Sequence, residues 1–195
     1  MIAIIDYKMG NLRSVENALH RLGADFVVTA DASVIRRADR VLLPGVGHCG
    51  EAMRHLRAAG LDAVIPSLRQ PVLGICVGLQ VMCRDSQEGD TQCLGIFDSH
   101  VRRFQPAPDL KVPHMGWNAL HLCRPQDPLF RYISEGECVY YVHSFYARNC
   151  RESTLATSEY GIAVTGAVKN GLVYGTQFHP EKSGETGLRL LKAFA

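Results

Sequence analysis

The sequence has no apolar run long enough to cross a membrane and no dense cluster of basic residues. Its 21 lysines and arginines are scattered along the chain, and 19 acidic residues leave a formal net charge of +2. Nucleic acids and acidic membrane surfaces require a concentrated basic face, so we expect neither as a partner. The chain also lacks an internal repeat, and its only proline-rich segment is RFQPAPD at residues 103–109.

The seven cysteines form no C-x-x-C pair, and their odd number argues against a disulfide framework. The N-terminus, MIAIIDYKMG, has no leading basic residues, so we expect a first strand there and no signal peptide. Both features favour the reducing cytoplasm. No His or Cys spacing suggests a metal site, and no cofactor is expected. Six cysteines are predicted to be apolar fillers or surface thiols: Cys49, Cys83, Cys93, Cys123, Cys138 and Cys150.

The order of the elements predicts a single α/β domain over residues 1–195. In the first half, short apolar strands (2–6, 25–29, 40–44, 71–75) alternate with helical patterns (12–22, 33–37, 51–60). Asn11 is a candidate N-cap of the first helix, and Gly23 a candidate stop. Short, nearly all-apolar strands separated by helices are typical of a parallel sheet that is covered on both faces.

The second half is richer in strands, which we expect at 100–104, 117–122, 138–145 and 154–159, and it ends in a helix at 187–194. The clearest local signal is AVTGAVKNGLVYGTQF, in which Asn170-Gly171 predicts a type I′ turn between two strands. The expected fold is therefore a three-layer α/β domain with a mixed, mostly parallel sheet and helices on both faces.

The stretch VLLPGVGHCGEAM places Gly45, Gly47 and Gly50 in the spacing G-x-G-x-x-G after a strand. This spacing can mark a dinucleotide site, but such a site needs an acidic residue at the end of the next strand. Here the next strand leads into Cys76 instead, and the loop follows the third predicted strand rather than the first. The pattern therefore favours another kind of anion, or an ordinary strand-to-helix turn.

The segment GICVG, residues 74–78, fits the nucleophile elbow G-x-[nucleophile]-x-G between a strand and a helix. Such a turn is too tight for side chains at the flanking positions, which explains the two glycines. An elbow would expose Cys76 at the carboxyl edge of the sheet and leave the backbone N–H of Val77 free to bind an oxyanion. By itself the pattern fits a buried cysteine in a glycine-rich turn equally well.

A cysteine nucleophile works best with a neighbouring base, and the segment GTQFHPEKSG supplies one in His179. Pro180 disfavours helix at the residue before it, and residues two apart in an extended chain point the same way. His179 and Glu181 are therefore expected to share a side, where the carboxylate could orient the imidazole.

The motifs GICVGLQ, with Cys76 and Gln80, and FHPEKS, with His179 and Glu181, resemble those of class I, triad-type glutamine amidotransferases, whose fold is flavodoxin-like. More narrowly, IIDYKMGNLRSV, LLPGVG, VPHMGWN and YYVHSF follow one another as in the glutaminase subunits of imidazole glycerol phosphate synthase. The resemblance covers essentially the whole chain. PHMGWN is its most discriminating motif.

The resemblance implies that Cys76 attacks the side-chain amide of glutamine while His179 moves protons and Glu181 orients His179. It also implies an oxyanion site at Val46, Gly47 and Val77, and substrate contacts at Gln80, Ser144 and Phe145. The ammonia would pass to a (β/α)₈-barrel cyclase in a heterodimer that makes imidazole glycerol phosphate and aminoimidazole carboxamide ribonucleotide for histidine biosynthesis. The interface residues implied are Asn11, Trp117 and Lys182.

Two departures stand out. Lys8 occupies a position where this family usually has glycine, and His48-Cys49 occupies one where small or aromatic residues are usual. We expect the His48-Cys49 pair to pack or to face solvent, without a catalytic role. Three other functions remain open from the sequence: a glutaminase that feeds a different synthase, such as one acting on nucleotide-linked sugars, a thiol hydrolase that cleaves esters, and a binding module without activity.

Overall fold

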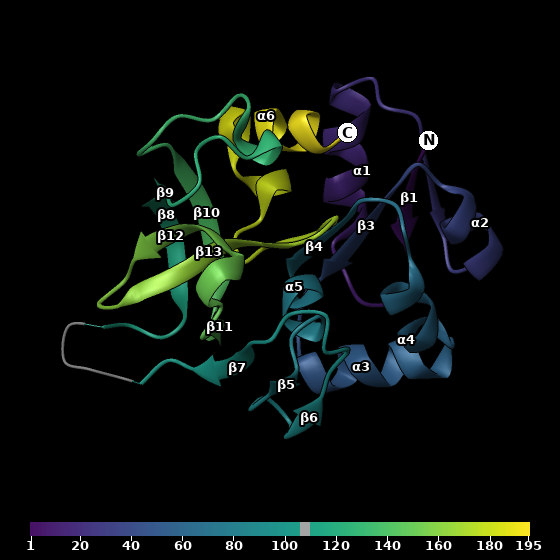
Figure 1. The fold of residues 1–195 in the computed structure, drawn as a ribbon, viewed down its shortest axis with the longest axis horizontal. Helices are drawn as coiled ribbons and strands as arrows, with labels where there is room; N and C mark the ends of the chain where they lie inside the picture. The colour runs from purple at the N-terminus through teal and green to yellow at the C-terminus, as the bar shows by residue number, and fades with distance from the viewer. Residues whose placement is uncertain (106–109) are drawn as a thin grey trace.

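An eight-stranded mixed sheet forms the centre of the computed structural model, which describes residues 1–105 and 110–195. The last four residues of the proline-rich segment lie outside the described residues. Figure 1 shows helices α1 and α6 on one side of the sheet and α3, α4 and α5 on the other, which confirms the expected α/β layering. The helices are α1 (Leu12–Arg21), α2 (Ala32–Arg37), α3 (Cys49–Ala58), α4 (Leu61–Val64), α5 (Val77–Val81) and α6 (Gly184–Phe194).

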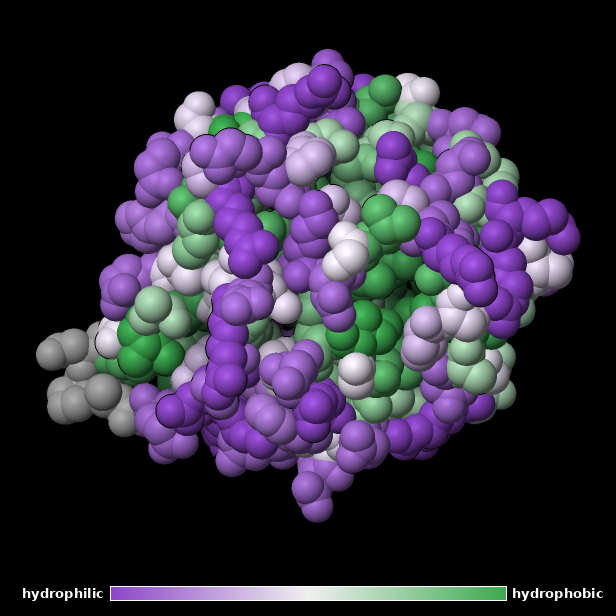
Figure 2. Space-filling view, in the orientation of Figure 1, coloured by the Kyte–Doolittle hydropathy of each residue, from purple (hydrophilic) through white to green (hydrophobic). Residues whose placement is uncertain are grey.

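The first five strands of the sheet are parallel and the last three antiparallel. Their order is β2 (Phe26–Thr29), β1 (Ile2–Ile5), β3 (Arg40–Gly45), β4 (Val72–Cys76), β14 (Val173–Thr176), β13 (Ala163–Asn170), β12 (Thr154–Glu159) and β9 (His121–Leu122). Strands β1 and β4 are buried along their whole length, as the all-apolar pattern predicts for a sheet covered on both faces. Figure 2 shows polar side chains over most of one face, with apolar ones gathered in a hollow right of centre.

Two smaller sheets stand beside the central one. Strand β10 (Cys138–His143) pairs with β8 (His114–Ala119), and β11 (Phe145–Arg148), β7 (His100–Arg103), β5 (Asp85–Ser86) and β6 (Thr91–Gln92) form the other. The prediction of one strand over 138–145 is wrong, because the chain bends at Ser144 and passes from one sheet to the other. The strand expected at 117–122 is likewise two strands in different sheets. Alternation of apolar residues cannot reveal such a break, since it continues through the bend.

The hairpin of β13 and β14 is present, but its predicted turn is wrong. Asn170 pairs with Val173, so the two connecting residues are Gly171 and Leu172. Gly171 has a φ of +58° and Leu172 is not among the residues with positive φ. Type I′ requires positive φ at both central residues, whereas type II′ requires it only at the first, which is usually glycine. The turn therefore follows the type II′ pattern.

Helix α1 buries Val15, Ala18 and Leu19 against the sheet, as the helical spacing predicts, and Gly23 follows its end with a φ of +64°. Asn11 occupies the N-cap position, but its side chain makes no capping hydrogen bond. The backbone carbonyl of Asn11 instead accepts the bonds from Ser14 and Val15. The Asn11 side chain is thus not used by the helix.

Candidate active site

Strand β4 ends at Cys76 and helix α5 begins at the next residue, which is the strand–turn–helix arrangement of an elbow. Cys76 has a φ of +54° and a ψ of −108°, a conformation that residues with side chains rarely adopt. A Cβ on Gly78 would lie 1.8 Å from the backbone oxygen of Leu43, and one on Gly74 would lie 2.7 Å from the backbone carbonyl of Gly78. Glycine is therefore required on both sides of Cys76. The Cys76 residue is 4% exposed, so it is less open than the sequence suggested, although it lines a cavity.

His179 and Glu181 lie together beneath this cavity. Nδ1 of His179 is 2.8 Å from Oε1 of Glu181, and each side chain is 2% exposed. His179 is extended, as expected, and Pro180 starts a 3₁₀ turn, Pro180–Lys182 (η4), that brings the carboxylate under the ring. Among the described residues, the other carboxylate oxygen of Glu181 is buried without a hydrogen-bond partner.

The surroundings of His179 favour its protonated form. Burial alone lowers the pKa of a histidine, but hydrogen bonds to Cys76 and Glu181 and the charges of these groups outweigh that effect and raise the pKa of His179 to about 10. At neutral pH the imidazole therefore holds a proton beside Sγ of Cys76. Such a group can protonate a leaving amine.

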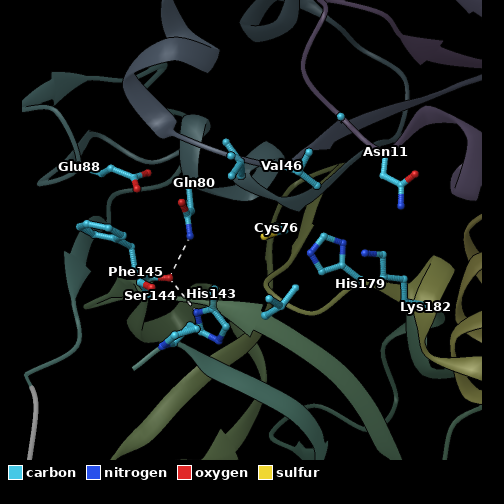
Figure 3. A pocket seen from close by; sticks show the side chains of 15 residues that line it. Asn11, Val46, Cys76, Gln80, Glu88, His143, Ser144, Phe145, His179 and Lys182 are labelled. Atoms are coloured by element: carbon cyan, nitrogen blue, oxygen red, sulfur yellow. Dashed lines mark hydrogen bonds between the residues drawn. The ribbon is translucent and has the colours of Figure 1, made fainter. Parts of the chain in front are cut away.

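A cavity of about 660 Å³ opens above Cys76 and His179 (Figure 3). It brings together most of the residues singled out in the sequence, from separate segments of the chain. Glu181 lies behind His179 outside the lining, and Trp117 lies outside the cavity. The lining residues are Gly10, Asn11, Val46, Gly47, Cys76, Val77, Gln80, Glu88, Pro113, Val142, His143, Ser144, Phe145, His179 and Lys182.

The glycines of the β3–α3 turn serve close packing and backbone shape. A Cβ on Gly45 would lie 2.6 Å from the backbone nitrogen of Gly78, so its absence lets β3 approach the elbow. Gly47 has a φ of +91° and lines the cavity with Val46 and Val77. A Cβ on Gly50 would lie 2.8 Å from the side chain of Thr91. Each glycine therefore has a reason that does not involve a dinucleotide.

Gln80 lies on α5 and joins two walls of the cavity. Its Nε2 donates to the backbone oxygen of Phe145 at 3.0 Å and to Oε1 of Gln177 at 3.2 Å. Nε2 of Gln177 in turn donates to Sγ of Cys76 at 3.7 Å. Gln177 was missed in the sequence, where its only signal is its position two residues before His179.

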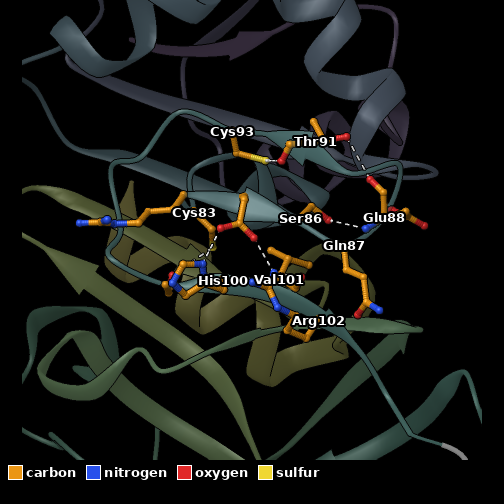
Figure 4. Close-up of polar contacts among 12 residues, drawn as sticks. Cys83, Ser86, Gln87, Glu88, Thr91, Cys93, His100, Val101 and Arg102 are labelled. Atoms are coloured by element: carbon orange, nitrogen blue, oxygen red, sulfur yellow. Dashed lines mark hydrogen bonds and ion pairs between the residues drawn. The ribbon is translucent and has the colours of Figure 1, made fainter.

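Glu88 is a second residue that the sequence did not reveal. Its Oε2 accepts a bond of 2.7 Å from the backbone N–H of Cys49, the first residue of α3, and so holds the end of the turn that carries Val46 and Gly47. Figure 4 shows Glu88 beside Ser86 and Gln87 at the small sheet, close to His100 and Arg102. The carboxylate of Asp85 in the same sheet contacts both His100 and Arg102. The loop after β5 therefore supports one wall of the cavity.

The three residues predicted at the interface lie in different surroundings. Asn11 and Lys182 line the mouth of the cavity (Figure 3). Trp117 is 58% exposed on β8, and Met115, on the same face, is 61% exposed. This exposure excludes Trp117 from the core.

The two departures from the family pattern have structural explanations. Lys8 has a φ of +68°, a left-handed conformation that glycine adopts without strain. His48 is exposed and caps α3, because its Nδ1 accepts from the backbone N–H of Gly50 at 3.1 Å. Cys49 is buried, with its Sγ 3.8 Å from that of Cys93. His48 therefore faces solvent and Cys49 packs in the core, which confirms the expectation for this pair.

All seven cysteines are free, and of the six outside the elbow only Cys123 and Cys138 are exposed, which fits the prediction of fillers and surface thiols. Within residues 1–105 and 110–195, no group of three or more His, Cys, Asp or Glu side chains could hold a metal ion. No helix in the same described residues is long and apolar enough to span a membrane.

The fold and this site together define a class I glutamine amidotransferase. Two solved structures share the fold. A glutamine amidotransferase matches with a TM-score of 0.76 and 18% sequence identity, and the match covers 100% of this chain and 97% of that chain. PurLQS from Thermotoga maritima matches with a TM-score of 0.72 and 17% sequence identity, and the match covers 99% of this chain and 96% of that chain. The family described as glutamine amidotransferase class-I matches residues 3–195.

Relatives with higher sequence identity indicate which family within this class the chain belongs to. The imidazole glycerol phosphate synthase subunit HisH of Bacteroides thetaiotaomicron is 50% identical over 99% of this chain and 97% of its own length. The corresponding HisH subunit of Listeria monocytogenes is 46% identical over 100% of this chain and 94% of its own length. The chain belongs to the class I glutamine amidotransferases and, within them, to the HisH family of imidazole glycerol phosphate synthase subunits.

Proposed function

We propose that this protein is the glutaminase subunit of imidazole glycerol phosphate synthase and that residues 1–195 act as one catalytic domain. It hydrolyses glutamine to glutamate and ammonia for histidine biosynthesis. The observation that carries the proposal is the convergence of Cys76 on its strained elbow, His179 and the buried Glu181 at one cavity. An ester hydrolase could share this triad, but the family relationship supports an amide substrate.

In the proposed reaction, the Cys76 thiol has already given its proton to His179, and its Sγ, as the thiolate, attacks the side-chain carbonyl carbon of glutamine. The developing oxyanion is held by backbone N–H groups of the Val46–Gly47 turn and of Val77, and one such donor is typically worth about a hundredfold to a thousandfold in rate. His179 gives its proton to the departing ammonia, which leaves a γ-glutamyl thioester on Cys76. His179 then takes a proton from water, which attacks the thioester and releases glutamate.

Within the cavity, Gln80 and the bend at Ser144 and Phe145 would hold the amino-acid end of glutamine. Gln80 is 2% exposed and hydrogen-bonded to the Phe145 backbone, so this wall is preorganised. The reacting amide would then point toward Cys76. The roles of these residues rest on their position in the cavity and on the family relationship.

The partner we propose is a (β/α)₈-barrel cyclase, bound as a heterodimer over the cavity mouth. Asn11 and Lys182 lie at that mouth, and the exposed Trp117 and Met115 offer apolar area of the kind that anchors interfaces. The cyclase would use the ammonia to make imidazole glycerol phosphate and aminoimidazole carboxamide ribonucleotide. Seven free thiols suit the reducing cytoplasm, where we place the complex.

The test is glutamate release from glutamine by the protein mixed with the cyclase and its nucleotide substrate. We expect release that depends on the cyclase and falls more than about a thousandfold in Cys76→Ala. Cys123→Ala, which changes an exposed thiol, is the matched control and should keep full activity. If the cyclase binds but no glutamate is released, the proposed glutaminase activity is refuted. If the protein hydrolyses glutamine but does not bind the cyclase, it serves a different synthase.

A further inference from the structure

A buried chain of hydrogen bonds leads from β8 to the wall of the cavity. Nδ2 of Asn118 lies 3.3 Å from Nε2 of His114, and Nδ1 of His114 lies 3.0 Å from Nε2 of His143. Nδ1 of His143 lies 2.8 Å from the backbone oxygen of Phe145, the same oxygen that Gln80 contacts (Figure 3). His114 and His143 are 2% and 6% exposed. Nothing in the proposed reaction uses either ring.

The groups at the two ends of this series of hydrogen bonds, the Phe145 carbonyl and the Asn118 amide, determine which atom donates in each bond. The Phe145 carbonyl can only accept, so Nδ1 of His143 carries a hydrogen. At the other end, Oδ1 of Asn118 accepts from the backbone of Ala119 and its Nδ2 donates to the backbone oxygen of Glu159, which fixes the amide. With Asn118 donating to His114, His114 must donate to His143, and His143 to Phe145.

This pattern requires both imidazoles to be neutral, and their surroundings keep them so. Burial lowers the pKa of His114 to about 4. Burial also dominates at His143, and the neighbouring His114 adds to it, so that the pKa of His143 falls to about 3. The His114 ring is stacked between Tyr141 and Tyr160, with ring centroids 4.5 and 3.9 Å away. Near neutral pH each ring therefore keeps one donor nitrogen and one acceptor nitrogen.

The Phe145 carbonyl, at the cavity end of this series of hydrogen bonds, determines the orientation of the Gln80 side-chain amide. One N–H of Gln80 donates to Phe145 and the other to Gln177, so both donors are occupied. Its Oε1 makes no hydrogen bond within residues 1–105 and 110–195, and Gln80 lines the cavity. The group left for a ligand is a hydrogen-bond acceptor, which suits a cation. In glutamine the cationic group is the α-ammonium.

We propose that His114 and His143 are positioning residues that hold the Phe145 carbonyl and thereby orient Gln80 as an acceptor for the α-ammonium group of glutamine. Phe145 is the first residue of β11, directly after the bend at Ser144, and pairs with Arg103 of β7. Its carbonyl accepts from two side chains, those of His143 and Gln80, so the bond from His143 fixes where that oxygen meets Gln80. The inference rests on the proposed glutaminase function and adds the residues that select an amino acid over a simple amide.

Two amide variants of His143 separate this role from simple packing. In His143→Asn, the amide nitrogen takes the place of Nδ1 and can still donate to Phe145. In His143→Gln, the side-chain oxygen can take the place of Nε2 and still accept from His114, but the donor to Phe145 is lost. Both variants remove the ring, so each controls for the other. The unfolding midpoint of each variant is measured first.

The readout is hydrolysis by the complex with the cyclase of two substrates: glutamine and glutaramate, which is glutamine without its α-amino group. For His143→Gln we expect the KM for glutamine to rise about tenfold with kcat within about twofold, because a binding contact far from the reacting amide is lost. Its preference for glutamine over glutaramate should fall by the same factor. His143→Asn should keep both the KM and the preference.

Equal effects of the two variants, or an unchanged preference in His143→Gln, would overturn the inference. His114→Gln, which loses the donor to His143, should shift the preference in the same direction by a smaller factor, and it replaces His143→Gln if that variant does not fold. A wild-type complex that hydrolyses neither substrate would instead refute the proposed function. The two failures are therefore distinguishable.

Discussion

Nδ1 of His179 lies 2.8 Å from Oε1 of Glu181, and both side chains are almost completely shielded from water. A buried carboxylate in this position stabilises the imidazolium and fixes the ring, so that Nε2 faces the thiol side. The pairing crosses only one residue in sequence, yet it depends on the 3₁₀ turn that follows His179. The activity of the protein should depend on this contact.

Glu181→Gln should lower glutaminase activity by about a hundredfold or more, because the neutral amide no longer stabilises the protonated ring. It should also lower the pKa of His179, since Glu181 is one of the groups that raise it. The measurements are steady-state glutamate release and an NMR titration of His179. Glu185→Gln, which changes an exposed carboxylate on α6, is the control. An unchanged titration in Glu181→Gln would contradict the prediction.

His179 should also make the stability of the fold depend on pH. Its pKa is raised in the folded protein, to about 10 from an ordinary value of 6.5, so its contribution is fully present below pH 6.5 and is lost as the pH rises through about 10. The free energy of unfolding of wild type, relative to His179→Gln, should therefore decline across that window. Urea titrations at several pH values measure this difference in the free energy of unfolding. If the difference between the two proteins does not change with pH, the prediction is wrong.

Gly78→Ala should destabilise the protein by at least about 3 kcal/mol, because a Cβ there would overlap the Leu43 carbonyl and force β3 and α5 apart. Gly171→Ala is the matched control. A Cβ on Gly171 would have no heavy atom within 4 Å, and the positive φ of this residue should cost only about 1 kcal/mol. Denaturant unfolding compares the two, and equal losses would show that the elbow tolerates a side chain.

Lys8→Gly should stabilise the protein by about 0.5–1 kcal/mol, because it removes the strain of a left-handed lysine at a φ of +68°. Lys8→Ala keeps that strain and should bring no such gain. Urea midpoints at an unchanged m-value measure the difference. If the alanine variant is stabilised as much as the glycine variant, the strain is not the cause.

Trp117→Ala should weaken binding of the cyclase by at least about 2 kcal/mol, or roughly thirtyfold, as expected for a central aromatic anchor. Its own stability should change little, since Trp117 is 58% exposed. Leu172→Ala is the control: Leu172 is 52% exposed but lies where β14 begins, at the sheet edge opposite Cys76. Titration calorimetry measures both, and unchanged binding in Trp117→Ala would remove β8 from the interface.

Much of this molecule follows from the amino-acid sequence alone. The nearly all-apolar runs of β1, β3 and β4, separated by helical patterns, are enough to predict a covered parallel sheet, because both faces of such strands must avoid water. Glycines on both sides of Cys76 and the HPE segment predict where a nucleophile and its base stand. These are local signals, in which spacing along the chain determines geometry.

Other features were decided only by the tertiary structure. The bend at Ser144 moves Phe145 into a second sheet, because a pairing partner far along the chain, Arg103, sets where that strand begins. The pairing of Asn170 with Val173 shifts the hairpin turn by one residue. The contacts of Gln177, Glu88 and the His114–His143 pair join segments that are distant in sequence. Hydrogen bonds of this kind depend on three-dimensional proximity, for which no local pattern of residues exists.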